Sequence, residues 1–168
     1  MNSESQVVTK QTQQILLLWQ LDLLSSDDVA DWLNTRVLEL ESLGHLPDWF
    51  FTLIERGPDR CLQMSSREFD FPWLPRDFHL KFCARLHRTN LRAPKELEAF
   101  THWIISASHG EDVDDPAVAL GNSLEHLAVE CDRLDLALAE ARARLPAFIG
   151  DAKARVATLF SGTGLQVR

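Results

Sequence analysis

The stretch that decides the fold runs from residue 120 to residue 145 and reads LGNSLEHLAVECDRLDLALAEARARL. Small or apolar residues recur in it at alternating steps of four and three, a spacing that holds one stripe of a helix against a partner surface. The positions between them include eight charged residues, as a solvent-facing side requires. The stripe, called the seam below, contains Leu120, Leu124, Leu127, Cys131, Leu134, Leu138, Ala141 and Leu145. The sequence therefore predicts an all-α protein with one long helix over about 115–145 and a buried seam.

Cap and proline signals place further helices before and after this long one. Ser25 and Ser26 can cap a helix that follows them, and Asp115 can cap the long helix. Pro47 and Pro94 suit the first turns of two others. The expected helices cover about 7–24, 26–41, 47–57, 76–89, 94–108, 115–145 and 147–160. The prediction is a bundle of six to seven helices packed around the long one.

Length and composition predict one soluble domain. The chain has 168 residues, 45% of them hydrophobic and 25% charged, which is ordinary for a single globular domain. We expect one helical domain over 1–168 with an ordered loop at 57–75 and a frayed tail at 161–168. The loop is expected to be ordered because Phe69, Phe71 and Trp73 are too apolar for a solvated linker.

The cellular location is predicted from what the sequence lacks. It has no apolar run long enough to span a membrane, and its first residues do not read as a signal peptide. Its three cysteines are odd in number and show no paired spacing. These features predict a reducing, cytoplasmic location without a membrane contact.

The net charge of −8 is unevenly distributed, because both ends of the chain are acidic and residues 56–95 are basic. Acidic proteins disfavour nonspecific binding to nucleic acid, which depends on neutralising phosphates. A protein partner of basic charge is favoured instead, with the chain itself a monomer or a weak homodimer. The acidic residues predicted to contact that partner are Asp27, Asp28, Asp31, Glu111 and Asp112.

A basic stripe lies on the helix expected at 76–89. At 100° per residue its members fall within an arc of roughly 60°. The stripe could bind an anion or a nucleic acid, or it could be an exposed face paired with the acidic ends of the chain, and we favour the second interpretation. Its members are Lys81, Arg85, Arg88 and Arg92.

His79, Cys83 and His87 recur on the same helix at steps of four. Two such residues can share a metal ion, but three of them span about 12 Å, too far for one ion. Glu98 or His102 from the next helix could complete a pair. Because no convincing third and fourth ligands are apparent, the sequence predicts structural burial, no metal and no cofactor. We also find no GxSxG, CxxC, P-loop or GxGxxG motif.

Two stretches, LLLWQLDLLSSDDVADWLNTRV and LPDWFFTLIERGPD, place aromatic and cap residues in a distinctive order. They resemble the start of helical immunity proteins from bacterial polymorphic-toxin systems. The resemblance covers about one third of the chain, and the glycine expected in the first turn is absent. It implies a cytoplasmic binder that blocks a cognate toxin without catalysis. The matching residues are Trp19, Ser26, Asp28, Val29, Trp32 and Pro47.

The leading functional prediction is a non-catalytic protein-interaction domain, and toxin immunity is its most specific form. One alternative is a metal-binding helical enzyme that uses the histidines of the helices expected at 76–89 and 94–108. Another is a nucleic-acid-associated regulator that uses the basic stripe. Metal retained through purification would favour the first alternative, and DNA binding that weakens steeply with salt would favour the second.

Overall fold

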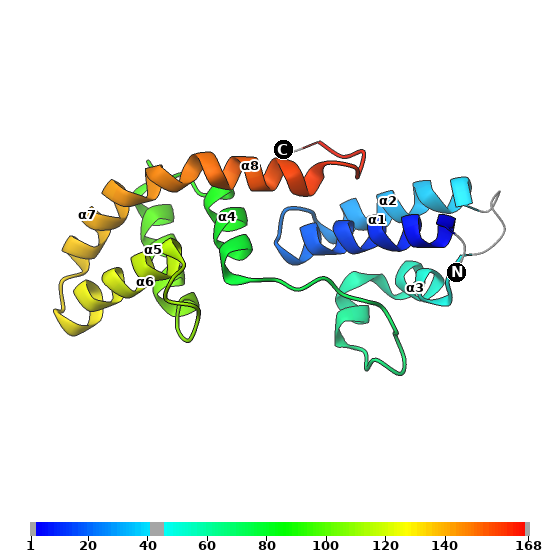
Figure 1. Cartoon of the computed structure of the whole chain (residues 1–168), viewed down its shortest axis with the longest axis horizontal. Helices are drawn as coiled ribbons and strands as arrows, with labels where there is room; N and C mark the ends of the chain where they lie inside the picture. The colour runs from blue at the N-terminus through cyan, green and yellow to red at the C-terminus, as the bar shows by residue number, and fades with distance from the viewer. Residues whose placement is uncertain (1–2, 41–45, 167–168) are drawn as a thin grey trace. The chain divides into compact units, whose positions relative to one another are not determined.

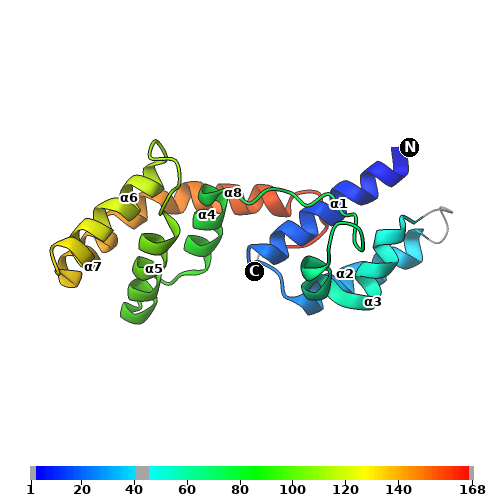
Figure 2. The same cartoon turned by 90° about the horizontal axis from the view of Figure 1, so that it is seen from below.

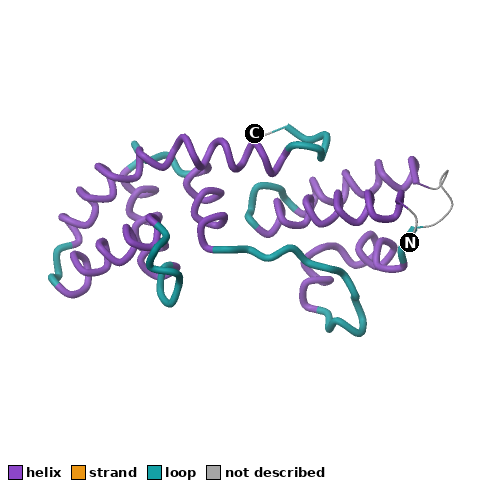
Figure 3. The backbone as a smooth tube through the Cα atoms, viewed as in Figure 1, coloured by secondary structure: helices purple, strands orange, loops and turns teal. Residues whose placement is uncertain are grey.

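The computed structural model describes residues 3–40 and 46–166. More than half of these residues are helical and none lies in a strand (Figure 3). This confirms the all-α prediction. The described residues pack as two compact units, where the sequence predicts a single domain. The first unit comprises the chain up to Pro75 together with Leu159–Gln166, and the second comprises Arg76–Thr158.

The first unit is built from α1 (Ser3–Gln20), α2 (Ser26–Leu40) and α3 (Asp48–Gln63), and α1 lies alongside α2 (Figure 1). The apolar second half of α1 is buried on several sides, as its sequence requires. A capping box starts α2, because the Asp28 amide donates to Ser25 Oγ and the Asp28 carboxylate accepts from the Ser25 amide. The fully buried side chains of this core include Ile15, Leu16, Leu18, Leu33, Phe50 and Leu53.

Helix α3 continues past the glycine where the sequence predicts its end. Gly57 takes a left-handed φ of 73° and kinks the helix, and Pro58 suits the first turn of the segment that follows. The loop therefore begins at Met64 rather than at residue 57. Within it, Phe71 is buried and packs edge-on against Trp49 at 4.8 Å between ring centroids.

The tail predicted to fray at 161–168 is instead anchored as far as Leu165, and residues 167–168 lie outside the described part of the chain. Thr163 is 2% exposed and its hydroxyl donates to the Phe160 carbonyl. Gln14 of α1 donates from its amide to the carbonyls of Leu159 and Ser161. Leu165 packs against the core of the first unit. These contacts explain why this segment belongs to the first unit.

The second unit contains α4 (Phe78–Arg88), α5 (Pro94–Ala107), α6 (Pro116–Glu125) and α7 (Leu134–Arg144), together with most of α8 (Ile149–Phe160). A short 3₁₀ turn over Leu145–Phe148 precedes α8. The fully buried side chains of this core include Phe82, Phe100, Ile104, Leu120, Leu124 and Ala141.

The prediction of one long helix over 115–145 is wrong. A π-helical turn over His126–Glu130 ends the first half, and Asp132 then takes a left-handed φ of 52°, which aspartate tolerates better than most residues. The second half, α7, folds back and packs against α6 (Figure 2). The two halves cover each other's apolar faces, which a straight helix could not do.

The hairpin formed by α6 and α7 buries only part of the seam. Leu120 and Leu124 from α6, Ala141 from α7 and Leu145 at the start of the 3₁₀ turn are fully buried. Leu127, Leu134 and Leu138 are only half-buried. Cys131 lies at the turn and is exposed, so its predicted burial is also wrong. The seam is therefore buried at its two ends and open near the turn.

Gly121 marks a close approach of α6 to α5, so we expect Gly121→Ala to destabilise the protein by about 1–3 kcal/mol. An added Cβ would lie 2.6 Å from Ser108 Cβ and 3.1 Å from the Ile104 carbonyl oxygen. Gly150, in α8, is the matched control because a Cβ there meets no atom within 4 Å. Gly150→Ala should stabilise the protein by about 0.5–1 kcal/mol. Urea denaturation measures both changes, and equal midpoints for the two variants would contradict the prediction.

Candidate functional site

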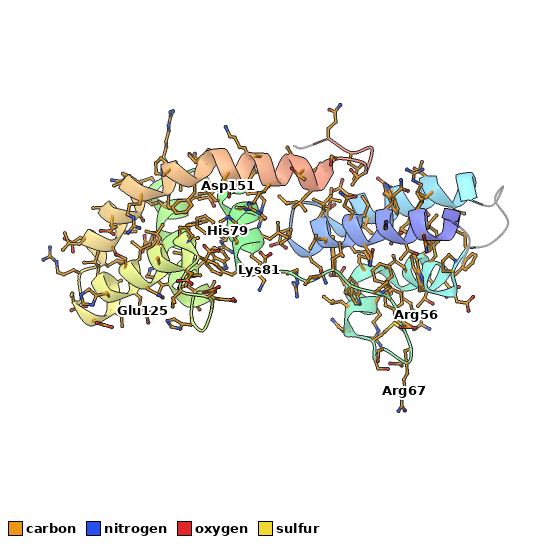
Figure 4. The ribbon with its side chains drawn as sticks, in the orientation of Figure 1. Arg56, Arg67, His79, Lys81, Glu125 and Asp151 are labelled. Carbon is orange, nitrogen blue, oxygen red and sulfur yellow. The ribbon has the colours of Figure 1, made fainter. Side chains whose placement is uncertain are left out.

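Three helices of the second unit bring four titratable side chains together. His79 and Cys83 lie one turn apart on α4, Asp115 precedes α6, and Asp151 lies in the first turn of α8. His79 Nδ1 is 2.9 Å from Asp115 Oδ2, and His79 Nε2 is 2.8 Å from Asp151 Oδ2. Figure 4 shows the His79 and Asp151 side chains close together, from α4 and α8. These four residues are called the His79 cluster.

Helix caps fix two positions of the cluster. Asp77 accepts from the Leu80 amide at 2.7 Å and starts α4, which places His79 in the first turn. Asp115 Oδ1 accepts from the Ala117 amide at 2.7 Å, so this carboxylate caps α6 with one oxygen and holds His79 with the other. The cap predicted at Asp115 is thus confirmed, with α6 as the helix that it starts.

Cys83 supplies a thiol on the buried side of the cluster. Its Sγ is 3.6 Å from Asp151 Oδ2, and its side chain is fully buried. Burial, with the nearby negative charge of Asp151, raises the pKa of the Cys83 thiol to about 12. The thiol is therefore protonated at neutral pH and is not activated as a nucleophile.

Asp151 is held in its ionised form on the solvent side of the cluster. Its hydrogen bond with His79 and the neighbouring Arg155 guanidinium lower the pKa of the Asp151 carboxyl. Arg155 Nε lies 3.1 Å from Asp151 Oδ2.

The His79 imidazole has a carboxylate at each nitrogen, Asp115 at Nδ1 and Asp151 at Nε2. It can donate to both carboxylates only when both nitrogens are protonated. The alternative is that one nitrogen binds a cation while the other donates.

Of the possible metal ligands that the sequence suggests, the structure brings His79 and Cys83 together and adds Asp151, and it leaves out His87, Glu98 and His102. His79 Nε2, Cys83 Sγ and an oxygen of Asp151 all lie within 4.8 Å of one another. His87 is outside this group, and its Nδ1 is buried with no hydrogen-bond partner in the described part of the chain. His102 and Glu98 face each other at 3.9 Å on an exposed side of α5. The sequence did not predict Asp151 as a ligand, because only the packing of α8 on α4 brings it close to His79 and Cys83.

Two members of the basic stripe, Lys81 and Arg85, are partly buried. The Arg85 guanidinium lies over the Trp103 ring, 4.9 Å from its centroid, a cation–π contact. Lys81 is half-buried, and Arg92 follows the end of α4 at Arg88. The structure therefore does not present four equivalent cations along one helix face.

The predicted acidic contacts fall into both units. Asp27 and Asp31 are exposed on α2, whereas Asp28 is occupied by the capping box. Glu111 and Asp112 are exposed in the turn that precedes α6. The first set lies in the first unit and the second set in the second unit, so each is a separate candidate surface.

The first unit also contains a groove of about 380 Å³ between the start of α3 and the loop that follows α3. The exposed Glu68 carboxyl has a lowered pKa because it accepts hydrogen bonds from the Ser65 hydroxyl and amide. Arg67 is the one cation of the lining, and its side chain extends away from the loop (Figure 4). The lining residues, called the acidic groove below, are Asp48, Trp49, Thr52, Arg67, Glu68, Phe69 and Asp70.

Comparisons of the chain with protein-family models, with curated proteins and with solved structures find no match. Among the described residues, no helix has the length and apolar character needed to cross a membrane.

The three thiols should differ sharply in their reaction with a maleimide. Cys131 is exposed, whereas Cys61 and Cys83 are buried, and burial raises the pKa of both buried thiols. We expect the native chain to label rapidly at one thiol and the unfolded chain at all three. Mass spectrometry after a short reaction measures the number of labels. Cys131→Ser should remove the fast label, and a fast label that persists in this variant would contradict the assignment.

Proposed function

We propose that this chain is a non-catalytic protein-interaction domain that binds and neutralises a cognate bacterial toxin, as an immunity protein does. The observation that carries the proposal is the acidic groove of the first unit. Its lining offers three carboxylates against one guanidinium, together with the side chains of Trp49 and Phe69. This lining favours a partner that presents basic side chains.

The groove has the chemistry to hold an arginine or lysine side chain. Trp49 is half-buried, and its ring is braced by Phe50 at 5.7 Å and Phe71 at 4.8 Å. A cation placed over a braced indole gains a cation–π interaction. The carboxylates of Asp48 and Asp70 can then accept charge-assisted hydrogen bonds. The groove volume lies within the range of side-chain and ligand pockets, so we assign it one basic anchor residue of the toxin.

The resemblance to immunity proteins maps onto the same unit. Trp19 donates from its indole nitrogen to Ser26 Oγ at 3.1 Å, and Ser26 Oγ donates to Asp59 of α3 at 2.7 Å. These contacts join the Trp-bearing first helix, the capped second helix and the Pro-led third helix that carry the resemblance. They support a rigid scaffold behind the groove, and a rigid scaffold favours tight blocking of a partner.

Co-expression tests the proposal. Each protein encoded beside this chain in its genome is produced with and without the chain, and growth is measured. We expect one neighbour to be toxic and the chain to restore growth. Calorimetry with an inactive form of that neighbour then measures binding. Absence of any toxic neighbour, or toxicity that the chain does not relieve, would contradict the immunity function.

A charge-reversal pair locates the contact. Asp70→Lys places a cation in the groove and should weaken binding on the order of tenfold or more. Asp31→Lys is the comparison variant, because it makes the same change at an exposed residue of α2 in the same unit, on the surface that the sequence suggests as the other partner contact. It should change binding far less. Greater loss with Asp31→Lys than with Asp70→Lys would move the interface to the α2 face.

A further inference from the structure

We propose that His79, Cys83 and Asp151 form a binding site for one zinc-like divalent metal ion in the second unit. The three residues offer an imidazole nitrogen, a sulfur and a carboxylate oxygen within 4.8 Å of one another. They come from α4 and α8, whose packing alone brings Asp151 to the other two ligands. This proposal does not depend on the function assigned to the acidic groove.

Two of the three donor-atom spacings lie close to those around a tetrahedral ion, and all three lie within 4.8 Å. Zinc bonds of about 2.0–2.3 Å place its ligand atoms about 3.3–3.6 Å apart. Cys83 Sγ and Asp151 Oδ2 are already 3.6 Å apart. His79 Nε2 and Asp151 Oδ2 lie 2.8 Å apart because they share a hydrogen bond. Entry of the ion would replace that hydrogen bond and increase the distance between the two atoms by about half an ångström.

Asp115 gives the cluster a feature that a chance grouping of ligands would lack. Metal-binding histidines donate their second ring nitrogen to a carboxylate or carbonyl, which fixes the tautomer and orients the ring. Asp115 Oδ2 accepts at His79 Nδ1 over 2.9 Å, and Asp115 is itself fixed by its bond to the Ala117 amide. His79 is thus oriented with Nε2 directed at Asp151.

Charge and access also suit a cation. Binding would release the proton of the buried Cys83 thiol, and the resulting thiolate and the Asp151 carboxylate would balance a charge of +2. The Asp151 side chain is 47% exposed, so the ion could take water as its fourth ligand. The other charged groups near the cluster are Asp77, Asp115 and Arg155. Arg155 is the cation that Asp151 holds in this structure.

The prediction of no metal from the sequence depended on the lack of convincing third and fourth ligands. His79 and Cys83 were recognised by their spacing, and the third candidate, His87, lies too far along the same helix. Asp151 supplies that third ligand from another helix. The structure therefore supplies one of the two missing ligands, and the proposed site leaves the fourth position to water.

Cobalt titration of the chelator-treated full chain tests the site. Co²⁺ reports a thiolate ligand by a charge-transfer band in the near ultraviolet and tetrahedral geometry by strong visible bands. We expect both in the native protein at one ion per chain, with loss of both when Zn²⁺ is added. Failure of the native protein to develop these bands at millimolar Co²⁺ would overturn the proposal.

Cysteine variants locate the ligand. Cys83→Ser should abolish the charge-transfer band. Cys131→Ser is the matched control, because Cys131 also lies near a histidine, with Sγ 3.7 Å from His126 Nε2, but it is exposed and outside the cluster. This variant should keep the band, and loss of the band in Cys131→Ser alone would assign the metal to the turn instead. If Cys83→Ser does not fold, Asp151→Asn at the exposed ligand should weaken Co²⁺ binding, and unchanged affinity would overturn the proposal.

Asp115→Asn separates orientation by the carboxylate from helix capping. Asparagine caps a helix about as well as aspartate, so α6 should be preserved. The lost carboxylate should lower metal affinity by about 10- to 100-fold.

Zn²⁺ should also raise the melting temperature of the native protein and leave that of Cys83→Ser unchanged. Equal shifts in both proteins would show that Zn²⁺ binds without Cys83 and would overturn the proposal.

Discussion

Replacing Leu124 by aspartate is expected to unfold the second unit. Leu124 is 0% exposed, and it packs in the core that α5, α6 and α7 share. An aspartate there would place a charge in an apolar environment without a partner. The expected loss exceeds about 4 kcal/mol, which is among the largest effects of single substitutions. Circular dichroism and urea denaturation of the purified variant measure it.

Leu136→Asp is the matched control on the other arm of the hairpin. Leu136 is 41% exposed and lies in the first turn of α7, where a negative charge is favourable. The same substitution should change stability by no more than about 0.5 kcal/mol. If α6 and α7 were instead one straight helix paired with another chain, Leu124→Asp would dissociate a dimer and leave the monomer folded. A folded, monomeric Leu124→Asp protein would contradict the hairpin core.

The seam shows what helical spacing can and cannot specify. A spacing of 3.5 residues states which side of a helix is apolar, and Leu120, Leu124, Ala141 and Leu145 are indeed buried. The same spacing is satisfied when the helix breaks and its halves fold onto each other. The break depends on the left-handed backbone at Asp132, and aspartate also occurs inside helices. Periodicity therefore predicted the helix type and the burial of four of the eight seam residues, but not the turn.

Local signals predicted the helix starts better than the ends. Ser25, Pro94 and Asp115 act where the sequence placed them, because the start of a helix is decided within one turn of the chain. Gly57 was interpreted as a terminator, yet it kinks α3, since Pro58 can begin a new helical turn at once. Whether a glycine ends or bends a helix depends on what the next segment packs against, and Pro58 and Cys61 are buried.

The candidate sites divide in the same way. The i and i+4 spacing of His79 and Cys83 is visible in the sequence, because one helix places both. Asp115 was expected only as a cap, and its second role toward His79 arises from the packing of α4 beside the start of α6. Asp151 and the lining of the acidic groove come from segments distant in sequence or from an irregular loop. No spacing rule addresses such contacts.

Two neighbouring phenylalanines of α3 provide the second large expected effect. Phe50 is 0% exposed and lies in the core of the first unit, and Phe51 is 51% exposed. Phe50→Ala removes a buried ring that contacts Trp49, so it should destabilise the protein by about 3–5 kcal/mol. Phe51→Ala removes the same atoms from a surface position and should cost no more than about 0.5 kcal/mol.

The comparison isolates burial because both variants replace a phenylalanine of α3 by alanine. The change in composition and in helix propensity is therefore the same. Any effect on the intrinsic stability of α3 is therefore common to both, and the difference between them measures burial alone. Four of the five tryptophans lie in the chain up to Pro75, so tryptophan fluorescence during urea denaturation reports mainly on the first unit. Similar midpoints for the two variants would mean that α3 does not present Phe50 to the core. A shift confined to Phe50→Ala would confirm the rotation of α3 that also places Asp48, Trp49 and Thr52 along the acidic groove.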